Sequence, residues 1–110
     1  MWHFFFAQRI RRPQPQVEVF DEHGNLLGVV DFLWHDPGVF LEFDGRIKYA
    51  QHRQPGESVA DYVMREKRRE EQICLVKGWV CIRVTWADLQ RPVVLARRIR
   101  KALESRTPPR

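Results

Sequence analysis

Two carboxylates in this sequence stand where a folding chain usually carries apolar residues. Asp31 lies in the apolar run 29–34 (VVDFLW), and Glu42 lies in the apolar run 39–44 (VFLEFD). A buried charge without a partner is costly, so a chain that keeps two of them side by side is expected to hold a cation between them. Divalent cations such as Mg²⁺ bind one or two carboxylates, water and a phosphate oxygen of the substrate. The pair therefore predicts a metal site that acts on phosphate esters.

The turn between the two runs decides whether the carboxylates meet. A four-residue loop at the turn sequence HDPG would pair Trp34 with Val39 and set Asp31 opposite Glu42. Opposite side chains in an antiparallel pair have Cβ atoms about 5 Å apart. A two-residue loop would set Asp31 opposite Asp44 instead, and any even loop keeps the three carboxylates on one face of the sheet. An odd loop would send Asp31 to the other face.

Lys48 completes the candidate catalytic set of Asp31, Glu42, Asp44 and Lys48. It follows Asp44 by four residues, and its ammonium group there would orient an attacking water or stabilise negative charge. The structural alternative is that Asp31 and Asp44 are solvated residues at strand ends and that Lys48 is a solvated side chain. The four histidines are scattered without ligand spacing, so we predict no zinc site.

The helix predicted over 58–76 supplies two supporting residues. Its apolar stripe, continued at spacings of three and four residues, passes through Glu66, Arg69 and Glu70. We expect Glu66 and Arg69 to face the carboxylates. In the alternative, these charges form surface pairs on a helix at the edge of the fold.

The elements that position these residues follow in the order helix, three strands, helix, strand, helix. Pro13 and Pro15 end the first helix, and Ser58 with Asp61 is a variant of the capping box at the start of the second. Gly78 ends that second helix. The expected helices are 2–11, 58–76 and 92–103, and the expected strands are 16–21, 26–34, 39–44 and 79–85.

The length of 110 residues allows one domain, expected over 1–104, with a disordered tail at 105–110. No apolar run approaches the ~18 residues of a membrane span. The apolar start at 1–7 is too short for a signal peptide and has no basic leader. Cys74 and Cys81 lack metal-ligand spacing, and we expect both to be reduced core residues, as in a cytoplasmic protein.

The net charge of +5 is unevenly distributed. Residues 1–16 contain three Arg and no acid, and 91–110 contain six Arg and one Lys against one Glu, whereas 17–90 contain 9 basic and 13 acidic residues. Basic ends around an acidic centre suit an enzyme that binds a polyanion and cuts it with a metal. The alternative is a merely solvated basic helix face. The candidates for DNA contacts are Arg9, Arg11, Arg12, Arg97, Arg98 and Lys101.

Four motifs in this order resemble the PD-(D/E)XK nuclease superfamily: 30–34 (VDFLW), 41–45 (LEFDG), 66–70 (EKRRE) and 78–86 (GWVCIRVTW). The resemblance covers about residues 15–102. It is closest to the Vsr-like branch around the very-short-patch-repair endonuclease and its bacterial relatives. It implies a restriction-endonuclease-like three-layer α/β/α core with a mixed four-stranded sheet. It also implies Mg²⁺ (or Mn²⁺) and hydrolysis of phosphodiester bonds.

The resemblance assigns a role to each matching position. Asp31 matches the first metal-binding Asp of the family, Glu42 its second acidic residue, and Arg69 the basic residue of the following helix. Two positions depart from the family pattern. Asp44 stands where the family usually has Lys, and residues 1–12 contain no acid where many members carry Glu on a first helix, which here is shortened.

These observations predict a metal-dependent DNA endonuclease in DNA repair or defence. The alternative is a weakly active or inactive nucleic-acid-binding module, resembling the C-terminal domain of abortive-infection antitoxins, and the two departures favour it. Both functions have DNA as the partner and no membrane. The sequence leaves the oligomeric state open, with a homodimer as one option.

Overall fold

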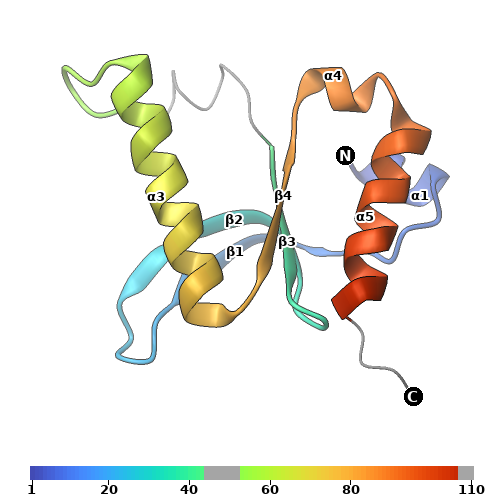
Figure 1. Cartoon of the computed structure of the whole chain (residues 1–110), viewed down its shortest axis with the longest axis horizontal. Helices are drawn as coiled ribbons and strands as arrows, with labels where there is room; N and C mark the ends of the chain where they lie inside the picture. The colour runs from blue at the N-terminus through green and yellow to red at the C-terminus, as the bar shows by residue number, and fades with distance from the viewer. Residues whose placement is uncertain (44–52, 107–110) are drawn as a thin grey trace.

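Four strands form one mixed sheet in the order β1-β2-β3-β4 (Figure 1). The computed structural model describes residues 1–43 and 53–106. Strands β1 (Gln14–Phe20), β2 (Leu26–Trp34) and β3 (Val39–Phe43) form an antiparallel meander, and β4 (Val80–Val84) runs parallel to β3. The predicted α/β class with a mixed four-stranded sheet is confirmed.

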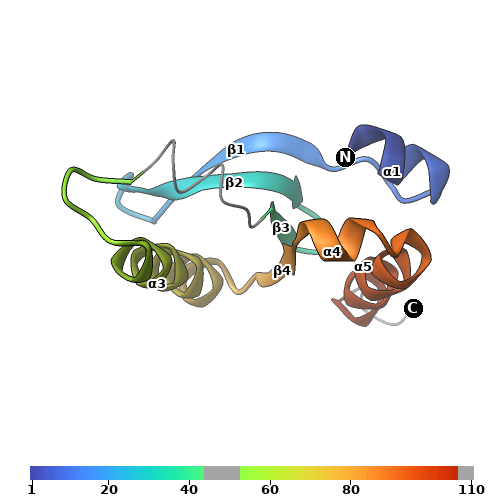
Figure 2. The same cartoon turned by 90° about the horizontal axis from the view of Figure 1, so that it is seen from above.

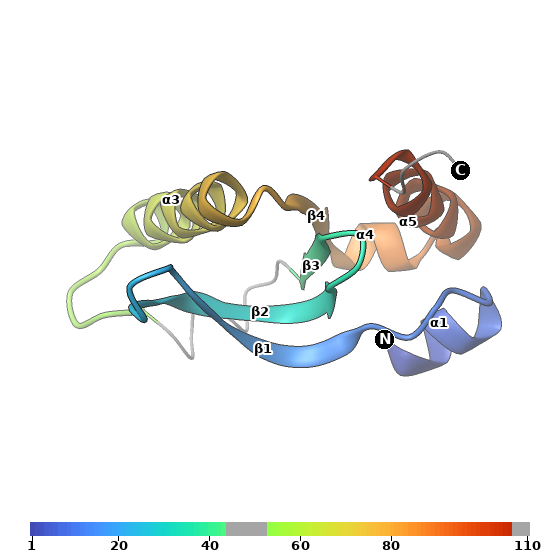
Figure 3. The ribbon, with the colours of Figure 1, turned by 90° about the horizontal axis from the view of Figure 1, so that it is seen from below.

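Helices cover the two faces of this sheet (Figures 2 and 3). Helix α3 (Val59–Lys77) makes the crossover that the parallel pair requires and packs on one face. Helices α1 (Trp2–Ala7) and α5 (Pro92–Arg106) pack together on the other face, and the short α4 (Trp86–Leu89) precedes α5. The core on the α3 face is built from Val19, Val30, Leu33, Phe40 and Ile73. The core on the α1 and α5 face includes Phe5, Trp34, Leu41, Val84, Leu95 and Ile99.

Helix α3 begins and ends at the residues that the sequence indicates. The Ser58 hydroxyl accepts a hydrogen bond from the backbone N–H of Asp61 at 3.1 Å. Gly78 adopts a left-handed conformation with a φ of 69°, and its N–H donates to the carbonyl of Cys74 at 2.9 Å. These two caps fix the helix relative to β4, which starts two residues later.

The buried face of α3 is narrower than predicted. The apolar stripe predicted to face inward consists of Val59, Tyr62, Val63, Ile73 and Val76. Tyr62 and Ile73 are buried, but the three valines are exposed. The helix has 19 residues, about 28 Å, whereas β3 and β4 have five residues each, about 17 Å. Its end turns therefore extend past these strands, and within the described residues 1–43 and 53–106 the apolar side chains there stay exposed.

Helix α1 ends four residues before its predicted end at residue 11. Arg9 adopts a left-handed conformation with a φ of 54°, which stops the helix after Ala7. The N–H of Ile10 then donates to the carbonyl of Phe5 at 2.9 Å. This turn buries Ile10 in the core beside Phe5, and burial of that side chain overrides the helical preference of the segment.

Helix α5 extends to Arg106, past the predicted end at Leu103. The guanidinium of Arg106 donates to the carbonyls of Pro37, at 3.3 Å, and of Gly78. The first two residues of the predicted tail are therefore helical, and 107–110 lie outside the described residues. These contacts tie the end of α5 to the β2–β3 turn.

In the part of the chain that the structure describes, no helix has the length and apolar run needed to cross a bilayer. Both cysteines are free and half-buried. Burial, with a contribution from Glu70, raises the pKa of the Cys81 thiol well above its ordinary value, and burial likewise raises the pKa of Cys74. Neither thiol is a reactive thiolate at neutral pH.

Candidate functional site

The β2–β3 hairpin has the predicted four-residue loop and register. Trp34 pairs with Val39, and the last paired position is Phe32 with Leu41, next to Asp31 and Glu42 in the sequence. Continued by one residue, this register would set Asp31 opposite Glu42. There the Asp31 carboxylate accepts a hydrogen bond from the backbone N–H of Phe43 at 2.7 Å. The predicted placement of two carboxylates on neighbouring strands is confirmed.

The outer strands β1 and β4 each place a polar residue in line with Asp31 and Glu42, which forms a polar row across the sheet. In β1, the residues on either side of Gln16 pair with β2, so Gln16 is set opposite Asp31. Gln16 has a φ of 49°, a left-handed conformation that costs a non-glycine residue about 1–2 kcal/mol. In β4, Arg83 pairs with Glu42. The row therefore places an amide, two carboxylates and a guanidinium on four adjacent strands.

Arg69 supplies the positive charge next to Glu42. Its Nη2 lies 3.1 Å from Glu42 Oε1 and 2.8 Å from Glu66 Oε2, and its Nη1 donates to the Val29 carbonyl at 3.2 Å. The Glu42 side chain is only 3% exposed. Burial alone would lower the pKa of Arg69, but the carboxylates of Glu42 and Glu66 outweigh it and raise the pKa above its ordinary value.

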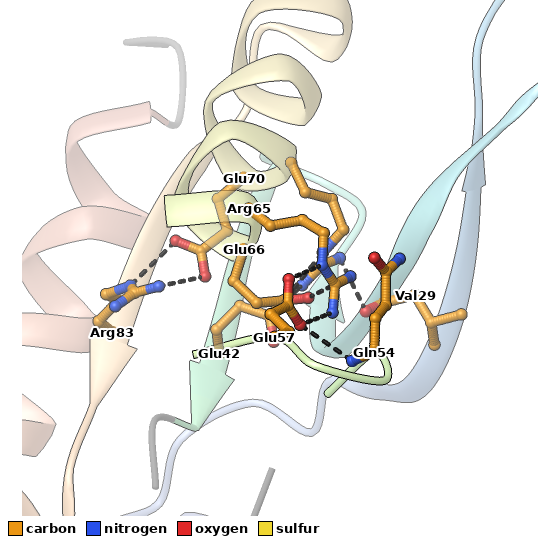
Figure 4. A network of polar contacts seen from close by, with 9 residues as sticks. Val29, Glu42, Gln54, Glu57, Arg65, Glu66, Glu70 and Arg83 are labelled. Carbon is orange, nitrogen blue, oxygen red and sulfur yellow. Dashed lines mark hydrogen bonds and ion pairs between the residues drawn. The ribbon is translucent and has the colours of Figure 1, made fainter. Parts of the chain in front are cut away.

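Two bidentate pairs, Arg83 with Glu70 and Arg65 with Glu57, belong to the same polar network (Figure 4). Arg83 on β4 donates to the two oxygens of Glu70 on α3 at 2.8 and 2.9 Å. Arg65 donates to the two oxygens of Glu57, just before α3, at 3.0 and 3.1 Å. The hydrogen bond from Arg65 lowers the pKa of Glu57. Glu70 therefore points toward β4, whereas Glu66 pairs with Arg69 along the same helix and lines the space between helix and sheet.

A cavity of about 420 Å³ lies between α3 and the β1–β2–β3 surface. Three carboxylates and two guanidinium groups line it, which gives hard oxygen ligands for a divalent cation and planar donors for a phosphate. The lining residues are Gln16, Val29, Asp31, Glu42, Tyr62, Arg65, Glu66 and Arg69.

No family model, curated protein or solved structure matches this chain. The chemistry of the cavity therefore has to be inferred from its own side chains.

Two members of the predicted catalytic set, Asp44 and Lys48, lie outside the described residues. Asp31 and Glu42 are adjacent and share the cavity, and Glu66 and Arg69 face the same cavity from α3. Within 1–43 and 53–106, no three His, Cys, Asp or Glu side chains gather closely enough to hold a metal ion by themselves.

The structure does not bring the basic ends of the chain to the carboxylates. The predicted DNA contacts lie on α5 and on the segment between α1 and β1, across the sheet from α3 (Figure 2). Several support the fold: Arg98 forms an ion pair with Asp88 at 3.3 Å, Arg11 donates to a carbonyl of the β2–β3 turn, and Arg12 stacks on Trp2. The other three, Arg9, Arg97 and Lys101, are exposed.

Three cavity residues with polar side chains were not predicted as site residues from the sequence: Gln16, Tyr62 and Arg65. For Tyr62 and Arg65 a signal exists, because each lies four residues before a predicted site residue, Glu66 or Arg69, on the same helix face. No local pattern identifies Gln16, because its place depends on the pairing of β1 with β2.

Gly28 leaves the space through which Arg69 reaches the sheet. A Cβ atom at residue 28 would lie 2.5 Å from Arg69 Nη1 and 2.8 Å from its Cδ. Gly28→Ala is therefore expected to displace the guanidinium from Val29 and Glu42 and to lower the free energy of unfolding by about 1–3 kcal/mol in urea titrations. In an Arg69→Ala background the same substitution should cost little. Equal costs in both backgrounds would contradict this explanation.

Proposed function

We propose that the protein is a metal-dependent endonuclease that hydrolyses phosphodiester bonds in DNA. The observation that carries the proposal is the adjacent pair of Asp31 and Glu42 on the wall of a cavity of about 420 Å³. Arg65 and Arg69 line the same cavity and present cationic donors to a bound phosphate. A carboxylate pair that can hold a metal ion, with positive charge beside it, is one arrangement that hydrolyses phosphodiesters.

The arrangement of the helices supports a restriction-endonuclease-like core. Helix α3 packs on one face of the mixed sheet, and α1 and α5 pack on the other. In this proposed core, the carboxylates lie on the two central strands beneath the crossover helix. A role in DNA repair or defence belongs to the same proposal.

The carboxylate pair fits Mg²⁺ or Mn²⁺, because both residues offer hard oxygen ligands on one cavity wall. Asp31 and Glu42 would hold the ion, with Asp44 as a further ligand. The ion supplies polarisation of the phosphate and a lower pKa for an attacking water. The Arg69 guanidinium lies 3.1 Å from Glu42 Oε1 and orients that carboxylate. We assign to Lys48 the orientation of the water and the stabilisation of developing charge.

The proposal is tested by incubating the protein with supercoiled plasmid and Mg²⁺ or Mn²⁺ at a concentration on the order of millimolar. Nicked circles are expected on a gel, and chelation by EDTA should stop their formation. The absence of nicking by the wild-type protein in both metals would sink the proposal.

A second function, nucleic-acid binding without catalysis, is favoured by one contact. The Arg69 guanidinium lies 3.1 Å from Glu42 and so already supplies a positive charge to that carboxylate. A pure binding module is expected to hold DNA with an affinity that falls steeply with salt and does not depend on divalent ions. Tight Mn²⁺ binding that is lost in Glu42→Ala would count against this function.

Gln16 is proposed to donate a hydrogen bond from its amide to the substrate phosphate. Gln16→Gly removes the amide and also relieves the left-handed backbone strain, so two opposite changes are expected. The free energy of unfolding should rise by up to about 1 kcal/mol, while nicking should slow about tenfold.

The stability change has a matched control in Arg9→Gly, which relieves similar strain at a φ of 54° on the other side of the sheet. If Gln16→Gly gains stability and nicks as fast as the wild type, Gln16 has no role in the reaction.

A further inference from the structure

A second cavity, of about 410 Å³, opens at α1 on the face of the sheet opposite to α3. Its lining residues are Trp2, Phe5, Phe6, Ile10 and Arg12. Phe5 and Ile10 are buried and form its floor, whereas Trp2 is 38% exposed and Phe6 is 84% exposed. Cavities of this size accept small flat ligands, and apolar walls with one polar group are typical of such sites.

The aromatic walls are held in place by the core. The Trp2 ring makes edge contacts with Phe5, at 5.9 Å between ring centroids, and with Phe32, at 5.2 Å. The Arg12 guanidinium lies over the Trp2 ring at 4.5 Å from its centroid. The flat surface of the Trp2–Arg12 pair is therefore already formed, and binding a ligand there costs little side-chain entropy.

The surroundings of the cavity are strongly cationic. Residues 1–16 contain three Arg and no acid. Arg100 on α5 donates to the carbonyl of Gln8 at the end of α1, at 2.9 Å, which brings the basic helix α5 beside this segment. Arg9 and Lys101 are exposed. By charge complementarity, the occupant has a flat apolar part for the cavity and negative charge beside it.

We propose that this cavity binds one unstacked nucleobase of a single-stranded nucleic acid. The base would stack on Phe6 and on the Trp2–Arg12 pair, and the neighbouring phosphates would lie against the arginines. Aromatic rings and guanidinium planes bind any unpaired base in this way, whereas bases in a duplex are already stacked. The inference builds on the proposed function, because it names the form of the nucleic acid that the protein prefers.

The test measures binding without metal, so its failure is distinct from a failure to nick DNA. In EDTA and at fixed salt, fluorescence anisotropy follows a labelled eight-nucleotide oligothymidine. Phe6→Ala is expected to raise the Kd about tenfold, the effect of losing one stacked base. The matched control is Leu75→Ala on α3, which removes a side chain that is 86% exposed and should leave the Kd unchanged.

An abasic strand of the same length separates base stacking from phosphate contacts. The wild type should bind it about tenfold more weakly than oligothymidine, and Phe6→Ala should not weaken it further. Equal affinity of the wild type for both strands, or of Phe6→Ala and wild type for oligothymidine, would overturn the proposal. Loss of binding to phosphatidylglycerol vesicles in Phe6→Ala, with oligothymidine binding intact, would also overturn it and assign the cavity to a lipid surface.

The folded state of each variant is checked by thermal unfolding. Phe6 is 84% exposed, so its truncation should leave the melting temperature nearly unchanged. A second variant, Arg12→Gln, keeps the aromatic walls and removes a cation. It should weaken oligothymidine binding and make the affinity less dependent on salt. An unchanged salt dependence would show that Arg12 contacts no phosphate and would contradict the proposed orientation.

Discussion

Replacing Arg69 with alanine is expected to lower the free energy of unfolding by about 3–5 kcal/mol. The guanidinium bonds Glu42, Glu66 and the Val29 carbonyl, and the Glu42 side chain is 3% exposed. Removing the cation would leave a buried carboxylate beside Asp31 without the charge that offsets both. Urea titration with matched m-values measures the loss.

Two variants separate this charge effect from general damage to α3. Arg68→Ala, on the exposed side of the same helix, should change stability by less than about 0.5 kcal/mol. The double variant Arg69→Ala/Glu42→Gln should recover a large part of the loss, because the buried charge is gone. A loss in Arg69→Ala no larger than that in Arg68→Ala, or a double variant less stable than Arg69→Ala, would refute this role.

The part of the site that could be predicted rests on local geometry. A four-residue turn and the alternation of strand residues suffice to set Asp31 opposite Glu42, because both strands are contiguous in sequence. The periodicity of α3 likewise turns Glu66 and Arg69 inward. These predictions depend only on residues that are close along the chain.

The rest depends on contacts between distant segments. Gln16 faces Asp31 only because β1 pairs with β2 in one register, and the left-handed conformation of Gln16 is not visible in its sequence. The basic ends were predicted to hold the nucleic acid that the carboxylates act on, and α1 and α5 pack on the face of the sheet opposite to α3. Net charge along a chain does not say which face of the fold each segment covers.

The same separation suggests a division of labour between the two faces. The cavity under α3 combines carboxylates with guanidinium groups that are already paired to them, as at Arg69 and Glu42. The cavity at α1 combines aromatic rings with one arginine, Arg12, and residues 1–16 contain no acid. In the proposals above, the first performs chemistry on phosphate and the second holds the strand.

Replacing Asp31 with asparagine is expected to reduce plasmid nicking at least about 100-fold with little loss of stability. The substitution keeps the shape of the side chain and an oxygen that can accept the bond from the Phe43 N–H, which is 2.7 Å long. It removes the negative charge that a divalent cation needs. Substitution of a residue that only orients a metal ligand typically lowers affinity or activity about 10–100-fold. Loss of a ligand itself is expected to have at least the upper end of this effect. Initial nicking rates at saturating Mn²⁺ measure the effect.

The matched control is Glu22→Gln, which neutralises a carboxylate that is 85% exposed in the β1–β2 turn. It changes the net charge by the same amount as Asp31→Asn but lies away from the cavity, so its nicking rate should stay within about twofold of the wild type. Thermal unfolding of both variants confirms that the fold persists. Nicking by Asp31→Asn at the wild-type rate would exclude Asp31 as a metal ligand, because a neutral amide cannot replace a carboxylate on Mg²⁺ without a large loss of affinity. Equal loss in both variants would instead assign the effect to net charge, which acts on DNA binding rather than on the reaction.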